Sequence, residues 1–138
     1  STNNIGSGGY ALVSPSGNYL PTAIGQYDVS GQVAIAGFAD QQPAGLAICI
    51  EGFSTFACKP LLNIHDLAVV PAFRGQGLAR KLLARVEALA LELGCCKLTL
   101  EVLEGNQVAK AAYRSFGFAG YELGNASGKA EFWQKKLG

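Results

Sequence analysis

Apolar runs separated by short polar segments predict a set of strands from residue 32 onward. Residues 32–40 and 44–53 are two such runs on either side of a short polar segment, a pattern typical of a β-hairpin. A third run, residues 60–70, stops at Pro71, and a fourth covers residues 96–103. We therefore expect four strands in this part of the chain.

Two stretches have the spacing of amphipathic helices. Between the third and fourth runs, apolar residues recur every three or four positions from Leu78 to Leu93, and Gly94 supplies a C-terminal stop. After the fourth run, Asn106 is a suitable N-cap for a second helix that ends at Gly117. The expected buried face of the second helix carries Val108, Ala109, Ala112 and Phe116.

The order of these elements predicts the fold class. A strand, a long helix and a strand in succession favour a right-handed crossover, so residues 60–70 and 96–103 should lie parallel. Residues 117–124 and 130–137 are expected to form a last pair of strands. The result is an α/β (α+β) fold, a mixed and mostly antiparallel sheet with helices on its faces.

The N-terminal segment does not follow this pattern. Residues 1–31 are rich in Gly, Ser, Asn and Pro and have no sustained helical period, so we expect loops with at most a short strand. Because the chain has no repeat and only 138 residues, we expect one domain over residues 1–138.

Composition and charge exclude several classes of partner. The formal net charge is +1, with 49% hydrophobic and 15% charged residues. A nearly neutral chain lacks the basic surface that holds nucleic-acid phosphates, so we expect no nucleic-acid partner. There is no apolar run close to the roughly 18 residues of a membrane span and no secretory signal pattern. We therefore expect a cytoplasmic protein without a membrane partner.

The cysteines are expected to be reduced thiols and not metal ligands. Cys49, Cys58, Cys95 and Cys96 show no CxxC spacing. A zinc site made from Cys95, Cys96 and His65 is disfavoured, because adjacent cysteines do not chelate one ion in the usual loop geometry. We expect no metal.

The start of the first helix concentrates positive charge. Arg74, Arg80, Lys81 and Arg85 surround it, and no acidic residue follows before Glu87. The first backbone N–H groups of a helix have no internal partner, and the helix dipole adds about half a positive charge there. This charge is unfavourable unless an anion is bound.

Gly75 and Gly77 would let such an anion approach the backbone closely, which predicts a phosphate or pyrophosphate site. The alternative is that Gly77 only ends a turn and that the basic residues form a solvated face. A P-loop is excluded because no Gly-Lys-Ser or Gly-Lys-Thr follows. An NAD(P)-binding protein stays a minor alternative, since Glu101 lies where a ribose-binding acid would be, although Arg80 replaces the third glycine.

Two motifs make residues 32–137 resemble the GNAT superfamily of acyl-CoA-dependent N-acetyltransferases. The first is Arg or Gln, two residues, Gly, one residue, then Gly or Ala, and its positions here are Arg74, Gly77 and Ala79. The positions of the second motif are Asn106, Ala109, Tyr113, Gly117 and Phe118. The resemblance implies a GNAT-like fold, whose central parallel strands splay apart, and acetyl-CoA as co-substrate.

The resemblance also implies which residues hold acetyl-CoA. Strand residues Leu67, Ala68 and Val69 would pair with the pantetheine arm through their backbone. Asn106 would hold the far end of the arm, and Tyr113 would face the sulfur. The pyrophosphate would be bound by the loop and helix start formed by Arg74, Gly75, Gln76, Gly77, Leu78, Ala79 and Arg80.

Acetyl transfer to an amine needs a base for the amine proton and an acid for the departing thiolate. The phenol of Tyr113 suits the second task. Glu101 matches the position of the catalytic glutamate in acetyltransferases of ribosomal-protein N-termini, and His65 matches a strand histidine of serotonin N-acetyltransferase. The choice between Glu101 and His65 as base stays open. By strand alternation, His65 would share a face with Asn63, Leu67 and Val69.

The short N-terminal segment sets this chain apart from the superfamily. GNAT proteins usually place a strand and two helices there, as a wall of the acceptor site, so we expect a shortened or reorganised wall. The expected acceptor is the primary amine of a small molecule or of a peptide N-terminus. A second subunit that completes the site would make the protein a homodimer. The alternative in another class is a catalytically silent acyl-CoA-binding or sensor module.

Overall fold

The computed structural model describes residues 3–5, 8–13, 32–39 and 42–138. The chain divides into two compact units, Ser1–Glu101 and Val102–Gly138. Each unit is described by itself below.

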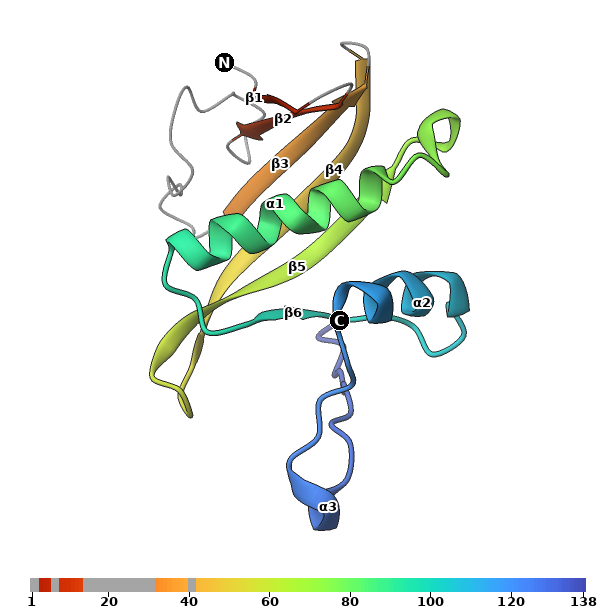
Figure 1. The fold of residues 1–138 in the computed structure, drawn as a ribbon. Helices are drawn as coiled ribbons and strands as arrows, with labels where there is room; N and C mark the ends of the chain where they lie inside the picture. The colour runs from red at the N-terminus through yellow and green to blue at the C-terminus, as the bar shows by residue number, and fades with distance from the viewer. Residues whose placement is uncertain (1–2, 6–7, 14–31, 40–41) are drawn as a thin grey trace. The chain divides into compact units, whose positions relative to one another are not determined.

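The N-terminal unit is built on a six-stranded sheet with the strand order β1-β2-β3-β4-β5-β6 (Figure 1). Neighbours are antiparallel from β1 to β5, whereas β5 and β6 are parallel. The mixed sheet and its parallel pair confirm the predicted fold class. The strands are β1 (Asn3–Ile5), β2 (Gly8–Val13), β3 (Gln32–Ala39), β4 (Gln42–Ser54), β5 (Lys59–Val69) and β6 (Leu98–Leu100).

The first 13 residues contain more regular structure than the sequence predicts. Strand β2 pairs with β3 along its whole length, and β1 pairs with β2. Strand β2 begins with two glycines, which are uncommon in strand interiors, and β1 has only three residues, so the apolar pattern did not reveal either strand. Residues 14–31, the rest of the segment expected to be irregular, lie outside the described residues.

Helix α1 (Leu78–Glu92) packs across one face of β3, β4 and β5 (Figure 1). It begins after Gly77 and is followed by Gly94 in a left-handed conformation (φ 73°), as its sequence predicts. Its buried residues follow the expected face: Leu78, Leu82, Leu83, Val86, Leu89 and Ala90. Opposite them, the sheet contributes Val33, Ile35, Ala47, Cys49, Leu62 and Ile64 to the core.

The helix comes close to the sheet because two strand positions lack a side chain. A Cβ atom added at Gly45 would lie 3.0 Å from the Ala68 carbonyl oxygen and 3.0 Å from Leu82 Cδ1. One added at Gly37, on the neighbouring strand, would lie 3.2 Å from Leu78 Cδ1. The first turns of α1 therefore rest directly on the backbone of β3 and β4.

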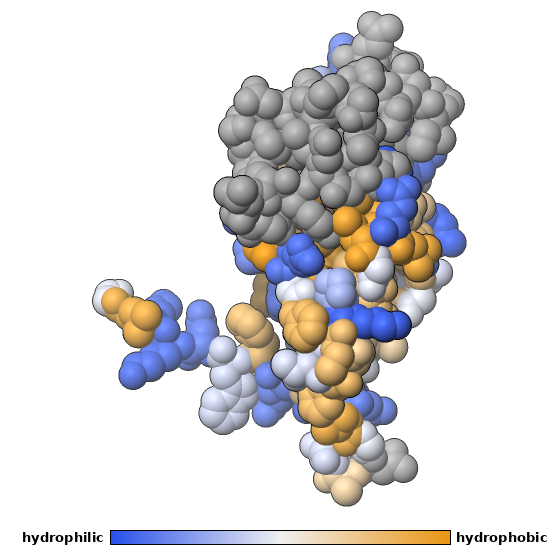
Figure 2. Space-filling view, turned by 90° about the vertical axis from the view of Figure 1, so that its left-hand side faces the viewer, coloured by the Kyte–Doolittle hydropathy of each residue, from blue (hydrophilic) through white to orange (hydrophobic). Residues whose placement is uncertain are grey.

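The C-terminal unit contains helices α2 (Gln107–Phe116) and α3 (Gly124–Ser127). The predicted strands at 117–124 and 130–137 are wrong: this region has only an isolated bridge between Glu122 and Lys129. A two-stranded hairpin without further strands or a covering layer is only marginally stable. Phe132 and Trp133 accordingly remain exposed, and apolar residues, drawn in orange, reach the surface at several places in Figure 2.

The predicted buried face of α2 is also wrong in part. Val108 is 85% exposed and Ala112 is exposed, whereas Ala109, Tyr113 and Phe116 are half-buried. On this face Tyr113 packs edge-on against Phe118, with ring centroids 5.9 Å apart.

No helix in the described part of the chain is both long and apolar enough to span a membrane.

We predict that Gly45→Ala lowers the free energy of unfolding by about 1–3 kcal/mol, because the added methyl group meets strand backbone that cannot move away. Gly52→Ala is the matched control on the same strand, since its Cβ would meet only the flexible side chain of Leu61. Urea unfolding of both variants measures the difference. Equal stability of the two variants would contradict the close contact between α1 and β4.

Candidate functional site

The segment between β5 and α1 leaves open space in front of the helix start. After Val69 the chain makes a single 3₁₀ turn (Pro71–Phe73), then passes through Gly75 (φ 79°) and Gly77 (φ 75°). A Cβ added at either glycine would have no atom within 4 Å. Both residues adopt left-handed conformations that favour glycine, and neither has a side chain to cover the backbone. A ligand can therefore reach the N–H groups of this turn.

The helix start lacks the groups that usually neutralise it. Its N-cap, Gly77, offers no side-chain hydrogen bond, and the first turn contains no acidic residue. Arg80 and Lys81 lie in that turn, and both are exposed. The N–H groups, the helix dipole and these side chains are together chemically suited to bind an anion.

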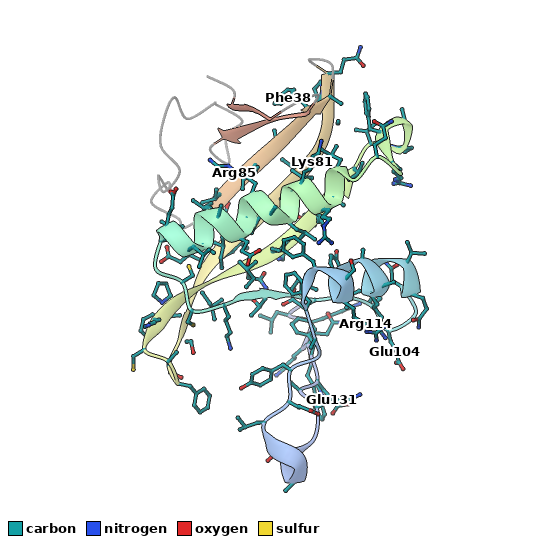
Figure 3. All side chains as sticks on the ribbon, in the orientation of Figure 1. Phe38, Lys81, Arg85, Glu104, Arg114 and Glu131 are labelled. Atoms are coloured by element: carbon teal, nitrogen blue, oxygen red, sulfur yellow. The ribbon has the colours of Figure 1, made fainter. Side chains whose placement is uncertain are left out.

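Arg85 differs from the other basic residues near this end of the helix. It lies seven residues after Leu78, about 10 Å along the axis, and projects from the same side of α1 as Lys81 (Figure 3). Burial lowers the pKa of its guanidinium, and nearby Glu92 acts in the opposite direction. The sequence predicted that Arg85 surrounds the helix start. In the structure it lies about two turns further along the helix.

The outer edge of β5 loses its strand partner near the middle of the strand. The parallel pairing with β6 ends at the pair Ile64 and Leu100, and no other strand in the described ranges pairs with this edge. Five residues of β5, positions 65–69, therefore continue beyond the parallel pair. The parallel pair thus leaves part of this edge of β5 without a strand partner among the described strands, where a splay is expected.

The hydrogen bonds of the inner edge show which backbone groups face outward. The Val70 N–H donates to the Ala44 carbonyl of β4, at 2.7 Å. Because the direction of the backbone groups alternates along a strand, those of Ala68 also point to β4, and those of Leu67 and Val69 point away from it. Of the three predicted strand residues, Leu67 and Val69 thus carry the N–H and C=O groups that a bound chain could use.

Arg74 connects this edge to the glycine turn. Its Nε donates a hydrogen bond to the Val69 carbonyl oxygen at 3.2 Å. The guanidinium is exposed and lies between the outward-facing edge and the start of the Gly75–Gly77 turn. Strand-edge groups, a cation and an open helix start thus follow one another along residues 67–78.

A bulge at His65 changes the expected faces of β5. Ile48 pairs with Asp66, and the next residue of β4, Cys49, pairs with Ile64, so His65 is an extra residue without its own partner. The alternation of faces expected along β5 therefore fails at this residue. Leu67 lies on the same, α1 side of the sheet as Ile64, because His65 is inserted between the two paired segments. His65 and Asp66 are both exposed.

His65 and Glu101 occupy equivalent places on the two parallel strands. Each is the first residue after the last pair, Ile64 and Leu100, and each is exposed. Two groups that can accept a proton thus flank the point where the strands diverge. This arrangement agrees with either residue as the base.

Asn106 and Tyr113 belong to the C-terminal unit. Asn106 is the N-cap of α2, as predicted, and its Oδ1 accepts a hydrogen bond from the Ala109 N–H at 3.2 Å. Tyr113 is half-buried, and burial raises the pKa of its phenol. The phenol therefore stays protonated at neutral pH. Contacts of Asn106 and Tyr113 with the donor remain predictions.

The described residues contain no group of three or more His, Cys, Asp or Glu side chains that could hold a metal ion. Cys95 and Cys96 follow α1, and His65 lies in β5.

Comparison with known proteins assigns the family. Residues 15–118 match the family model of the acetyltransferase (GNAT) family. The chain belongs to the GNAT family. Its membership accounts for the succession of strand β5, glycine turn and helix α1, where the first GNAT motif was identified.

Curated relatives of this GNAT chain are acetyltransferases. Thialysine N-epsilon-acetyltransferase of Bos taurus is 39% identical over 73 residues, which cover 53% of this chain and 42% of the relative. Streptothricin acetyltransferase of Streptomyces lavendulae is 37% identical over 92 residues, 67% of this chain and 47% of the relative. The chain thus spans less than half the length of both relatives.

Solved structures agree with the GNAT fold. An integron cassette protein from the mobile metagenome of V. cholerae superimposes with a TM-score of 0.65 and 22% identity, over 80% of this chain and 64% of that one. At this identity the likeness concerns the fold alone.

Two features of this GNAT site escaped the sequence analysis. One is the bulge at His65, which has no local sequence signal because no glycine or proline marks it. The other is a hydrogen bond between the side chains of Asn63 and Thr99. The sequence signal for this hydrogen bond was that Asn63 and Thr99 are polar residues inside two apolar runs that were predicted to be parallel strands.

Proposed function

We propose that this GNAT chain transfers the acetyl group of acetyl-CoA to the primary amine of a small molecule or of a peptide N-terminus. One observation carries the proposal: the outward-facing edge of β5 leads through Arg74 into an open, uncapped helix start. An extended amide chain that ends in a pyrophosphate has the chemistry to fit this surface. The amine-acetylating relatives support the reaction class.

The donor would be held by groups that need no rearrangement. The pyrophosphate would accept hydrogen bonds from the N–H groups of residues 75–80, where no Cβ blocks Gly75 or Gly77. The pantetheine amides would pair with the outward-facing groups of Leu67 and Val69, as an added strand does. Arg74 would stand between these two parts of the ligand.

The chemistry assigned to the side chains is a direct transfer. The amine nitrogen attacks the thioester carbonyl carbon, the carbon–sulfur bond breaks, and the amine proton passes to Glu101 or His65, directly or through a water. The phenol of Tyr113 gives its proton to the leaving thiolate. Burial raises the pKa of this phenol, so it carries its proton when the thiolate leaves.

The dinucleotide alternative is not favoured. Dinucleotide-binding folds of this type use a largely parallel sheet, whereas β5 and β6 form the single parallel pair among the described strands. The silent acyl-CoA-binding module differs from the proposed enzyme only in turnover. Release of CoA in the presence of an amine distinguishes those two.

We predict that Gly77→Ala weakens acetyl-CoA binding about tenfold or more, because the methyl group would occupy space in front of the helix N–H groups. Gly94→Ala is the control: Gly94 has nearly the same φ and equally open surroundings, but it lies at the other end of α1. Both substitutions should cost about 1–2 kcal/mol of stability, since both place a side chain in the left-handed region.

Titration calorimetry with acetyl-CoA, and with NAD and NADP as comparison ligands, measures the difference. Equal loss of acetyl-CoA affinity in the two variants would contradict the assigned pyrophosphate site. Binding of NAD or NADP in preference to acetyl-CoA would overturn the proposed donor.

We predict that Tyr113→Phe lowers kcat about a hundredfold, because the leaving thiolate loses its proton donor. The KM for acetyl-CoA should change little, since the ring and its contact with Phe118 are kept. Burial raises the phenol pKa, so wild-type activity should fall only as the pH rises above the ordinary tyrosine range. This alkaline fall should be absent from Tyr113→Phe. An unchanged kcat in the variant would remove Tyr113 from the mechanism.

A further inference from the structure

A side-chain hydrogen bond joins β5 and β6 close to where they part. The Asn63 Nδ2 donates to the Thr99 Oγ1 at 2.9 Å. The two residues are direct partners in the parallel ladder, and both are half-buried. By pairing with Ile50 of β4, Asn63 lies on the face of the sheet opposite α1, away from the buried core residues Leu62 and Ile64.

The Asn63–Thr99 hydrogen bond lies at the same sequence distance from each of the two candidate bases. Asn63 lies two residues before His65, and Thr99 lies two residues before Glu101. One further pair, Ile64 with Leu100, separates the bond from the divergence.

Strand β6 needs such support because it is short. It contains three residues, and its ladder with β5 has three residue pairs. The Leu62 N–H also donates to the Lys97 carbonyl at 3.2 Å, at the start of the ladder. The end of the ladder, next to Glu101, lacks a following strand segment to hold it, whereas β5 is held on its other edge by β4. Any loosening of this end would move Glu101 more than His65.

We propose that the Asn63–Thr99 pair is a positioning pair for the reaction, which sets the separation of His65 and Glu101 at the point of divergence. This inference rests on the proposed acetyltransferase function. In this role the pair acts through the backbone: its hydrogen bond links the two strands two residues before each proton-accepting residue. A water held between the imidazole and the carboxylate would depend on that separation.

The physical reason for an effect on rate is geometric. Proton transfer requires a donor and an acceptor within hydrogen-bond reach, directly or through one water. A displacement of about 1 Å from outside the reacting groups can cost as much as a hundredfold in rate. A positioning pair should therefore act on kcat and on the pH profile, and not on donor affinity.

The test compares Thr99→Val with Thr99→Ser in the full chain. Valine keeps the branched shape of threonine but cannot accept the hydrogen bond, whereas serine keeps the hydroxyl group. We expect Thr99→Val to lower kcat about tenfold to a hundredfold and to shift the pH profile of kcat/KM, with the KM for acetyl-CoA within about twofold of wild type. Thr99→Ser should retain a kcat within about threefold of wild type and the wild-type pH profile.

Asn63→Ala is a second variant, which removes the same hydrogen bond from the other strand. It keeps the test valid if Thr99→Val fails to fold. If the two residues act together, Asn63→Ala and the double variant with Thr99→Val should lose about as much kcat as Thr99→Val alone. Calorimetry with acetyl-CoA, in the absence of amine, checks that each variant still folds and binds the donor.

The outcomes separate this inference from the proposed function. A wild-type kcat and pH profile in Thr99→Val, or equal losses in Thr99→Val and Thr99→Ser, would overturn the positioning role and leave the acetyltransferase proposal standing. A wild-type protein that binds acetyl-CoA but releases no CoA with any primary amine would overturn the proposed function, and the positioning role with it.

Discussion

The separation of β5 from β6 after the pair Ile64 and Leu100 is the constraint on which the site depends. Backbone groups in a folded chain need partners, so a strand edge that loses its neighbour must face water or a ligand. Here the edge carries the N–H groups of Leu67 and Val69 and the Leu67 carbonyl, while the Val69 carbonyl accepts a hydrogen bond from Arg74. The bulge at His65 accompanies the separation and changes which residues of β5 face α1. The bulge and the end of the β6 ladder thus occur at neighbouring residues of β5, next to the exposed position His65.

The packing of α1 gives this open edge its second component. Because Gly45 and Gly37 carry no side chains, the first turns of the helix lie directly on the sheet. The buried residues Leu78 and Leu82 hold the helix there, so its uncapped start is fixed beside the end of β5. The hydrophobic core thereby holds the positively charged helix start next to the strand edge. The acyl-donor site proposed for this GNAT chain combines the helix start and the strand edge.

The sequence predicted the parts of the fold that strong periodicity or a terminating residue specifies. The β3–β4 hairpin, the parallel pair and the extent of α1 were of this kind, since the apolar periodicity begins at Leu78 and Gly94 marks the stop. It failed where tertiary partners decide. Residues 130–137, predicted as a strand, form none, and the bulge at His65 broke the alternation of β5 without a sequence signal. The candidate residues were found by motif, but the directions of their backbone groups required the ladder register.

Amide hydrogen exchange tests the central claim most directly, because it reads individual backbone groups of β5. The account predicts that the Leu67 and Val69 amides exchange rapidly in the free protein and become at least about tenfold slower when acetyl-CoA saturates it. The Ala68 and Val70 amides, which face β4, should be protected in both states. Leu67 and Val69 amides that are already protected without ligand, or that do not respond to acetyl-CoA at saturation, would contradict an open strand edge as the binding surface for the donor.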